Sequence, residues 1–425
     1  MRLWRRGRKD PGYRQSLAER FGFSRGIRPG AIWIHAVSVG ETRAAQPLIE
    51  SYLAQGKTIL LTCMTPNGKR TGADVYAKAI AEGRLQQTYL PYDLCWSVER
   101  FLKTAQPALG LLMETEAWPT VVFRCAELRL PLFLINARLS ERSARRVAHF
   151  GAAGRALFQA FTGILAQTEL DAQRYRSLGV RHCEVVGNLK FDVAQDPCLV
   201  ERGIAWHEHL QSSKRLMVCA ASTREGEEEV ILQAWKMVLA EYAKDTDSDS
   251  LVKPLLCIVP RHPERFSEVA NTMESYGLAL VRRSALDSNE WDKDATLLAD
   301  IDVVLGDSMG EMPLYYNASD LVVMGGSLMP LGGQNLIEAC AAACPVLLGE
   351  HTFNFQQASI DAVKAGAALR IECGAALVPH LANAILTLLN DSAQREQMAQ
   401  AAIEYAAHHQ GATQKIRAAL SRFTD

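Results

Sequence analysis

Short apolar runs alternate with segments of helical periodicity along the whole chain. In the first half these runs predict strands at Ile32 to Val37, Thr58 to Cys63, Leu109 to Met113, Leu132 to Asn136, Ile164 to Ala166 and Cys183 to Val186. Strands that are apolar on both faces, each followed by a turn and a helix, are typical of a parallel sheet covered by crossover helices. The first half therefore predicts an α/β domain.

The same pattern starts again in the second half. The predicted strands there are Leu216 to Ala221, Leu255 to Val259, Leu278 to Val281, Val303 to Leu305, Leu321 to Met324 and Pro345 to Leu348. A polar stretch of helical character over residues 192–214 separates the two halves and contains no strand-like run. The polar stretches 244–250 and 284–293 lack periodicity, so we predict surface loops there.

The repeated pattern predicts two domains, and a length of 425 residues also exceeds what one hydrophobic core usually organises. We expect an N-terminal Rossmann-like domain over residues 14–191, a linker over 192–214 and a C-terminal Rossmann-like domain over 215–425. Ligands of open α/β sheets bind at the loops that follow the strands. We therefore expect the two domains to face a central cleft, with the chemistry just after each strand.

Composition and charge exclude several classes of protein. Hydrophobic residues make up 48% of the chain and charged residues 22%, and the net charge is only -1. These values are ordinary for a globular enzyme, and no global basic field favours nucleic acid as a partner. The ten cysteines form no CxxC pair. Cys340 and Cys344 lie four residues apart on a predicted helix, but no His or Cys follows at metal-ligand spacing, so we predict no metal site.

The first nine residues differ from the rest of the chain. They read MRLWRRGRK and carry five basic side chains around Trp4. Such a segment suits an anionic membrane surface, and a solvated basic tail is the alternative. No apolar run is long enough to span a bilayer and no signal-peptide pattern is present. We interpret the segment, residues 1–13, as membrane-proximal, in a chain from which an upstream anchor is absent.

The loops after the first-half strands carry candidate catalytic side chains. Neither GxGxxG nor GxxxxGK[ST] occurs, which leaves dinucleotide oxidoreductases and P-loop phosphotransferases unsupported. Glu41 opens a helix after the first strand, where it either only stabilises the helix or accepts a proton. Glu114 and Glu116 follow the third strand, where carboxylates cap a helix or stabilise positive charge on a sugar carbon. Lys190 either neutralises a leaving phosphate or lies on a hinge surface.

Five polar or glycine-rich loops follow strands in the second half. They are residues 222–228, 260–263, 306–311, 325–327 and 332–338. Backbone N–H groups in such loops bind anions, so a nucleotide phosphate can bind here without a P-loop. Glu338, in the first turn of the following helix, is placed to accept from a ribose hydroxyl pair.

Eight segments of the chain occur in the same order as the signature segments of a known family. They are HAVSVGE, METEAWP, NARLSERS, GNLKFD, VPRHPERF, GDSMGEM, GGSLMPLGGQNLIEA and GEHTFNF. In these segments the chain resembles the 3-deoxy-D-manno-octulosonic acid (Kdo) transferases. The resemblance implies a GT-B glycosyltransferase with an N-terminal domain for a lipid acceptor and a C-terminal domain for CMP-Kdo.

The resemblance also implies roles for individual residues. Glu41 would be the catalytic base, and Glu114 and Lys190 would stabilise the transition state. The residues that hold CMP would be Pro260, Arg261, Met309, Gly310, Glu311, Asn335, Leu336, Ile337 and Glu338. The implied reaction is an inverting transfer of Kdo from CMP-Kdo to the tetraacyldisaccharide lipid A precursor, in lipopolysaccharide biosynthesis at the cytoplasmic face of the inner membrane, with no cofactor or metal.

The chain departs from the family pattern at Ala117, where leucine is usual, at Arg224, where histidine is usual, and in lacking the apolar N-terminal anchor. Two other functions stay open at this point. Another GT-B transferase or a nucleotide-sugar epimerase would share the phosphate loops, and release of CMP from a donor panel would separate these enzymes. A non-catalytic nucleotide-binding scaffold at the membrane would keep its role after Glu41→Ala, whereas an enzyme would lose transfer.

Overall fold

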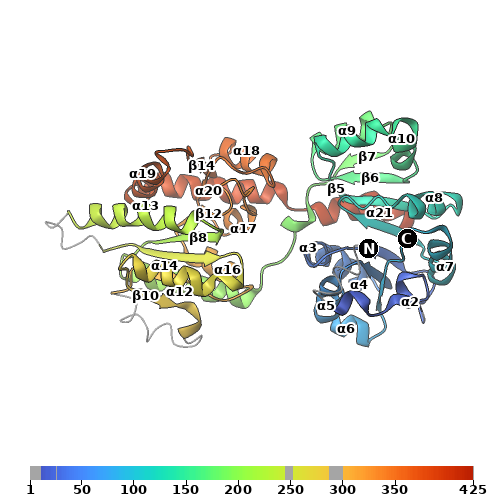
Figure 1. Ribbon diagram of the computed structural model, residues 1–425, viewed down its shortest axis with the longest axis horizontal. Helices are drawn as coiled ribbons and strands as arrows, with labels where there is room; N and C mark the ends of the chain where they lie inside the picture. The colour runs from blue at the N-terminus through green and yellow to red at the C-terminus, as the bar shows by residue number, and fades with distance from the viewer. Residues whose placement is uncertain (1–10, 25, 245–251, 287–299, 425) are drawn as a thin grey trace. The chain divides into compact units, whose positions relative to one another are not determined.

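The computed structural model describes residues 11–24, 26–244, 252–286 and 300–424. The basic segment 1–10, nearly all of the stretch 244–250 and most of the stretch 284–293 lie outside the described residues. The chain divides into two compact units, which are coloured along the chain in Figure 1. Unit 1 comprises Met1–Ala194 with His409–Asp425, and unit 2 comprises Gln195–His408.

Unit 1 is built on a seven-stranded parallel sheet with the order β3-β2-β1-β4-β5-β6-β7. The strands are β1 (Ile32–His35), β2 (Ile59–Cys63), β3 (Leu85–Tyr89), β4 (Leu109–Met113), β5 (Leu132–Ala137), β6 (Gly163–Ala166) and β7 (Cys183–Val185). The helices are η1 (Pro11–Arg14), α2 (Leu17–Arg20), α3 (Val39–Ala44), α4 (Gln46–Ala54), α5 (Pro66–Val75), α6 (Ala77–Ala81), α7 (Cys95–Ala105), α8 (Pro119–Glu127), α9 (Glu141–His149), α10 (Gly151–Gln159), α11 (Glu169–Ser177), η2 (Leu189–Phe191) and α21 (Ala412–Thr424). The order reverses between β1 and β4, so the sheet is doubly wound with its switch point between these two strands.

The central strands of unit 1 are apolar because both of their faces are covered. Every residue of β1 and β4 is buried. Ile32 and Ile34 point into one core cluster, and Trp33 points into another on the opposite face. Gly110 is paired with Trp33, and a Cβ at this glycine would lie 2.6 Å from a Leu132 side-chain carbon. The bulky neighbours thus require glycine at this point of β4.

Unit 2 repeats the architecture with the strand order β10-β11-β9-β8-β12-β13-β14, all pairs parallel. The strands are β8 (Met217–Thr223), β9 (Leu255–Pro260), β10 (Leu280–Arg282), β11 (Val303–Leu305), β12 (Leu321–Met324), β13 (Val346–Leu348) and β14 (Ala368–Arg370). The helices are α12 (Pro197–Ser212), α13 (Glu227–Tyr242), η3 (Pro263–Arg265), α14 (Phe266–Ser275), η4 (Arg283–Ala285), α16 (Met312–Ala318), α17 (Ile337–Ala341), α18 (Gln356–Lys364), α19 (Leu377–Asn390) and α20 (Ser392–His409). Here the switch point lies between β8 and β12. The prediction of two α/β domains with parallel sheets is confirmed.

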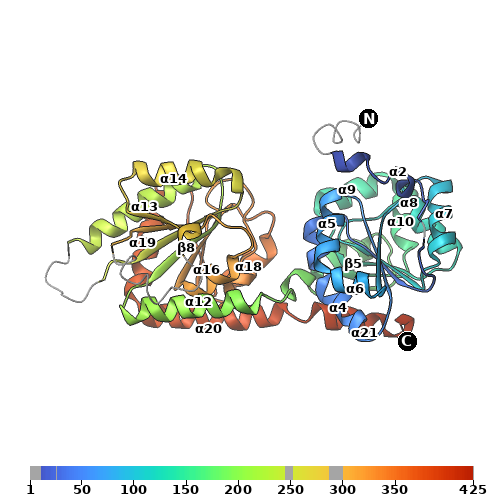
Figure 2. The same ribbon diagram turned by 90° about the horizontal axis from the view of Figure 1, so that it is seen from below.

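The domain boundaries differ from the predicted ones at two places. Most of the stretch predicted as a linker, residues 192–214, is helix α12, which packs on α16 inside unit 2, and the unit boundary lies between Ala194 and Gln195. The predicted second domain ran to residue 425, whereas the last helix, α21, packs on unit 1 beside α4 (Figures 1 and 2). The reason is burial, because Ile416 and Leu420 enter the core of unit 1 and the Phe423 ring lies 5.1 Å from that of Phe133.

None of the helices within the described ranges has the length and hydropathy that crossing a bilayer requires.

Candidate active site

Glu41 follows β1 at the switch point of the unit 1 sheet, on the first turn of α3. Ser38 is the N-cap of this helix, and its hydroxyl accepts from the Glu41 N–H at 3.4 Å. The Glu41 carboxylate in turn accepts from the Val37 N–H at 2.8 Å and from the Ser38 hydroxyl at 3.2 Å. This reciprocal pattern resembles a capping box, except that the carboxylate accepts from the N–H of the residue before the N-cap. It fixes the carboxylate at the end of β1, as expected for a residue just after a strand.

The environment of Glu41 changes its acidity. The pKa of the partly buried Glu41 carboxyl group is raised to about 7, and burial is the largest cause of this rise. The nearby carboxylates of Glu114 and Glu116 also contribute to this rise, and the hydrogen bonds from Val37 and Ser38 oppose it. A carboxylate whose pKa lies near neutrality binds a proton much better than an ordinary glutamate while remaining partly ionised. The raised pKa of Glu41 is thus compatible with proton acceptance near neutral pH.

Glu114 follows β4, the strand next to β1, and pairs with Lys190. The Lys190 Nζ lies 2.8 Å from Glu114 Oε1. Glu114 has a φ of 55°, a left-handed conformation that is uncommon for a residue with a side chain. Its backbone is fixed on both sides, because its N–H donates to Ile135 O at 3.0 Å and its carbonyl accepts from the Arg138 N–H at 3.2 Å. Such a conformation persists only where the surroundings enforce it.

Lys190 lies on η2, which packs against α3, the helix of Glu41. The three residues predicted as catalytic are thus brought together at the carboxyl edge of one sheet. Two come from the strands that flank its switch point, and the third comes from the loop after β7. The carboxylates of Glu41 and Glu114 and the ammonium group of Lys190 thus lie at one place. Such a set of groups suits a reaction in which a proton moves and charge separates.

Asn136 and Gln167 hold the segment that carries Lys190, and sequence reasoning missed this role. Asn136 is fully buried at the end of β5. Its Oδ1 accepts from the Leu189 N–H at 3.0 Å, and its carbonyl accepts from Gln167 Nε2 at 2.9 Å. Gln167 Oε1 also accepts from Asn188 at 3.3 Å. These contacts act on the loop rather than on a ligand.

Glu227 is the main unpredicted residue of unit 2. It is fully buried at the start of α13, beside the β8/β12 switch point. Its carboxylate accepts from the backbone N–H of Arg224 at 2.9 Å, of Gly326 at 2.6 Å and of Leu328 at 3.0 Å. The N–H groups of Gly326 and Leu328 therefore donate to a carboxylate of the protein itself. Within the predicted phosphate-binding loop 325–327, the Gly326 N–H is therefore already bonded within the chain.

Arg261, Asn335 and Glu338, three of the residues predicted to bind CMP, lie near one another in unit 2. Arg261 is exposed just after β9, and its N–H donates to Thr223 O at 2.9 Å. Glu338 is on the first turn of α17 and accepts from Asn335 Nδ2 at 2.9 Å. Burial raises the pKa of Glu338, and the charge of Arg261 opposes this rise, so the two side chains are near each other. A cation, an amide and a carboxylate at strand ends suit a nucleotide monophosphate.

Several other residues that were predicted to bind CMP expose only some of their atoms to a ligand. Pro260, Leu336 and Ile337 are buried, so their side chains belong to the core and only their backbones are available to a ligand. Met309 is 59% exposed, and Gly310, at a φ of 84°, is also on the surface.

Glu311 supports this surface segment instead of facing outward. Its carboxylate lies 3.1 Å from Arg283 Nη2 and 4.0 Å from Arg202 Nη1, and it accepts from the Ser308 hydroxyl. We therefore interpret Glu311 as a residue that fixes the loop after β11.

No group of three or more His, Cys, Asp or Glu side chains in the described part of the chain is arranged to hold a metal ion. Cys340 and Cys344, the pair considered from the sequence, are both buried, and the Cys344 thiol donates to the Tyr316 carbonyl at 2.9 Å.

Sequence comparisons with known proteins identify the family of the chain. The sequence model described as 3-deoxy-D-manno-octulosonic-acid transferase (kdotransferase) matches residues 15–193. The 3-deoxy-D-manno-octulosonic acid transferase of Bordetella pertussis is 41% identical, with 98% of this chain and 94% of that protein covered. The protein of the same name from Haemophilus influenzae is 36% identical, with 96% and 91% covered.

Solved structures with the same fold include nucleotide-sugar enzymes. A putative UDP-N-acetylglucosamine 2-epimerase from Listeria monocytogenes has a TM-score of 0.58 at 13% identity, with 93% of this chain and 97% of that chain covered. The UDP-GlcNAc 2-epimerase from Neisseria meningitidis has a TM-score of 0.57 at 13% identity, with 92% and 100% covered. At such identity the likeness shows the fold alone. The near full-length identity to the transferases decides the family: the chain belongs to the 3-deoxy-D-manno-octulosonic acid transferases, glycosyltransferases of lipopolysaccharide biosynthesis.

Proposed function

We propose that the protein transfers Kdo from CMP-Kdo to a sugar hydroxyl of the tetraacyldisaccharide lipid A precursor, with inversion at the anomeric carbon. Family membership supports the transfer of Kdo. The observation that carries the mechanism is the Glu41 carboxyl group, whose pKa of about 7 and fixed position at the switch point of unit 1 suit a general base.

Glu41 starts the reaction by removing the proton of the acceptor hydroxyl. A neutral hydroxyl is a weak nucleophile, so the new C–O bond forms at the anomeric carbon of Kdo as this proton passes to the Glu41 carboxylate. The bond from that carbon to the CMP phosphate oxygen breaks at the same time, and its electron pair leaves with CMP. Attack on the face opposite the leaving group in a single step inverts the configuration.

Lys190 and Glu114 act on the charges that develop during this step. Glu114 accepts the Lys190 ammonium at 2.8 Å and so holds it at a defined place. The ammonium stabilises negative charge on the leaving phosphate, and the carboxylate stabilises positive charge on the sugar ring. In unit 2, Arg261, Asn335 and Glu338 supply the ionic and hydrogen-bonding groups for CMP. We propose that these groups, with the backbones of residues 309–310 and 336–337, form the donor site.

We also propose that the protein works at the cytoplasmic face of the inner membrane. Its acceptor is a lipid, and the first nine residues carry five basic side chains. Each basic side chain near an anionic bilayer contributes about 1 kcal/mol to binding.

Incubation with CMP-Kdo and the tetraacyldisaccharide precursor, with products resolved by mass, tests the function. We expect one or more Kdo increments on the lipid and an equal amount of released CMP, while UDP-sugars give neither. NMR of the new linkage should show the anomeric configuration opposite to that of the donor. Glu41→Gln should remove nearly all transfer and keep CMP binding. Retained configuration, or full activity of Glu41→Gln, would contradict the mechanism.

A further inference from the structure

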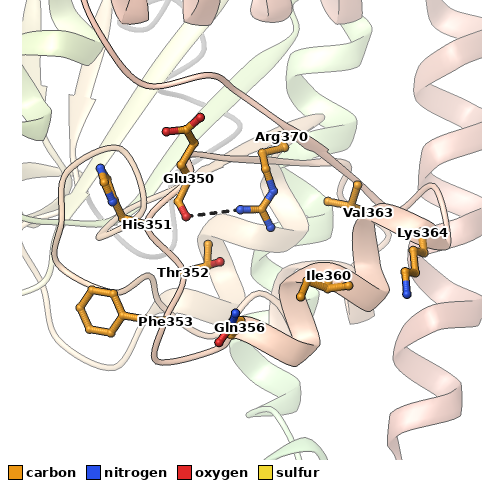
Figure 3. A pocket seen from close by; sticks show the side chains of 9 residues that line it. All are labelled: Glu350, His351, Thr352, Phe353, Gln356, Ile360, Val363, Lys364 and Arg370. Atoms are coloured by element: carbon orange, nitrogen blue, oxygen red, sulfur yellow. Dashed lines mark hydrogen bonds between the residues drawn. The ribbon is translucent and has the colours of Figure 1, made fainter.

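A pocket of about 560 Å³ lies in unit 2, outside the residues assigned to CMP. It is formed by the loop after β13, by helix α18 and by Arg370 at the end of β14 (Figure 3). Its size is in the range of cavities that bind small ligands. The sequence resemblance supplied no role for Arg370 or for α18.

Three basic side chains line this pocket. They are His351 on the β13 loop, Lys364 at the end of α18, and Arg370. Among the described residues, neither Lys364 nor Arg370 forms an ion pair. Within the described part of the chain, the hydrogen bonds of Arg370 are long ones, from Nη1 to the carbonyl oxygens of Gly349 at 3.5 Å and Glu350 at 3.4 Å. Most of the guanidinium donors therefore remain available to an anion.

One acidic residue also lines the pocket. Figure 3 shows the Glu350 carboxylate pointing away from the Arg370 guanidinium, which contacts only its backbone oxygen. The Phe353 ring, 63% exposed, and the Ile360 side chain supply apolar surface. A ligand that suits these walls has an anionic group, further polar groups and a compact carbon framework. A sugar acid has all three.

The loop after β13, which lines this pocket, also contacts the glycine-rich segment that follows β12. The Gly349 N–H donates to Ser327 Oγ at 2.9 Å, and the His351 N–H donates to Ser327 O at 3.1 Å. The Asn354 N–H donates to Gly332 O at 2.9 Å. Gly349, whose carbonyl contacts Arg370, therefore also touches the loop after β12. A ligand bound along the β12 loop has the pocket next to it.

We propose that this pocket binds the carboxylate of the sugar acid in the donor, with Arg370 as the principal partner and Lys364 as a second cation. The inference rests on the proposed function, because it assigns to CMP-Kdo a sugar subsite beside its nucleotide site. The guanidinium presents parallel N–H donors to the two carboxylate oxygens. The pocket thereby distinguishes the sugar acid donor from the CMP product, which lacks a carboxylate.

The test compares donor and product affinity in the full-length protein. We expect Arg370→Gln to raise the KM for CMP-Kdo about tenfold or more and to leave the inhibition constant of CMP unchanged within about twofold. Lys364→Gln should act in the same direction with a smaller effect, and Arg370→Lys should restore part of the affinity. Lys236→Gln, an exposed lysine on α13, is the matched control and should change neither constant.

The outcomes separate this proposal from the function on which it rests. Absence of Kdo transfer by the wild-type protein would overturn the proposed function itself. With wild-type transfer intact, an unchanged KM in Arg370→Gln would overturn the subsite, and so would a parallel rise in the CMP inhibition constant. Titration with free Kdo tests whether the pocket binds the sugar acid of the donor or a free sugar acid. Arg370-dependent binding of free Kdo, with an unchanged KM for CMP-Kdo, would assign the pocket to a free sugar acid and contradict our proposal.

Discussion

The Leu189 N–H donates to Oδ1 of Asn136 at 3.0 Å, and this contact joins the end of β5 to the turn that carries Lys190. Asn136 is fully buried and has a φ of 49°, so its side chain turns back toward η2. Asparagine tolerates this conformation better than most residues, and its amide oxygen supplies the acceptor. The position of the Lys190 ammonium thus depends on a residue that no ligand is expected to touch.

Asn136→Gly should slow transfer while leaving CMP affinity unchanged. Glycine accepts the positive φ without strain, so the substitution removes the acceptor for Leu189 and little else. We expect a fall in kcat of about 10- to 100-fold, since displacement of a catalytic group by about 1 Å costs that order of rate. Arg129→Gly is the control, because Arg129 has a φ of 55° and is exposed just after the end of α8. Equal effects of the two variants would show that Asn136 has no positioning role.

The transfer rate should follow the titration of Glu41. Only the ionised carboxylate accepts a proton, so kcat/KM should fall as the pH drops below about 7 and level off above it. Glu114→Gln removes a negative charge that raises the Glu41 pKa, so the midpoint of the profile should move to lower pH even though the maximal rate falls. The profile is measured with saturating acceptor. A midpoint near the ordinary glutamate value in the wild-type protein would contradict this account.

The apolar runs of the sequence predicted the interior of both sheets, and their edges were harder to see. Strands β3 and β14 were not predicted, and each is an edge strand of its sheet. The β3 sequence is LQQTY, with two glutamines, and β14 has only three residues. An edge strand is covered less than a central one, so its composition resembles that of a loop. Helix α21 was assigned to the wrong unit because an amphipathic pattern shows which face is buried but not which core receives it.

The residues of the candidate site also fall into those that the sequence could identify and those that it could not. Glu41 and Glu114 could be found because each follows a recognisable strand, and parallel strands bring their carboxyl ends to one edge. Glu227 and Asn136 could not be assigned because their roles depend on contacts across about 100 and 53 positions of the chain. A glutamate in a first helical turn and an asparagine at a strand end have many local explanations, and only the fold identifies their partners.

Glu227→Gln should weaken CMP binding by about tenfold. The amide keeps one acceptor oxygen but replaces the other with an NH₂ group, so one of the backbone N–H donors on the β12 loop loses its partner. We expect the loop at residues 326–328 to shift and the inhibition constant of CMP to rise. Glu225→Gln is the matched control, since Glu225 is 57% exposed in its side chain and pairs only with Arg224 among the described ion pairs. Unchanged CMP inhibition in Glu227→Gln would refute a link between this carboxylate and the nucleotide site.

Glu228→Ala should destabilise unit 2 far more than removal of a surface carboxylate. Glu228 Oε1 accepts from Thr223 at 2.7 Å, and both carboxylate oxygens bind Arg265, at 2.7 and 3.1 Å. The side chains of this ion pair are only 4% and 9% exposed. Alanine would leave the Arg265 charge buried without its main partner, which costs about 3–5 kcal/mol. The exposed Glu241, which pairs with Lys244, provides the control, and Glu241→Ala should change stability by less than about 1 kcal/mol.

Amide hydrogen exchange suits this measurement because the two units need not unfold together. The most protected amides of β8 and β9 report the free energy of unfolding of unit 2, and those of β1 and β4 serve as an internal reference in unit 1. Glu228→Ala should speed exchange in β8 and β9 and leave β1 and β4 unchanged. A small effect in β8 and β9, similar to that of Glu241→Ala, would mean that water or Glu268, 3.3 Å from Arg265, compensates the lost partner. The prediction of a costly unpaired charge would then be wrong.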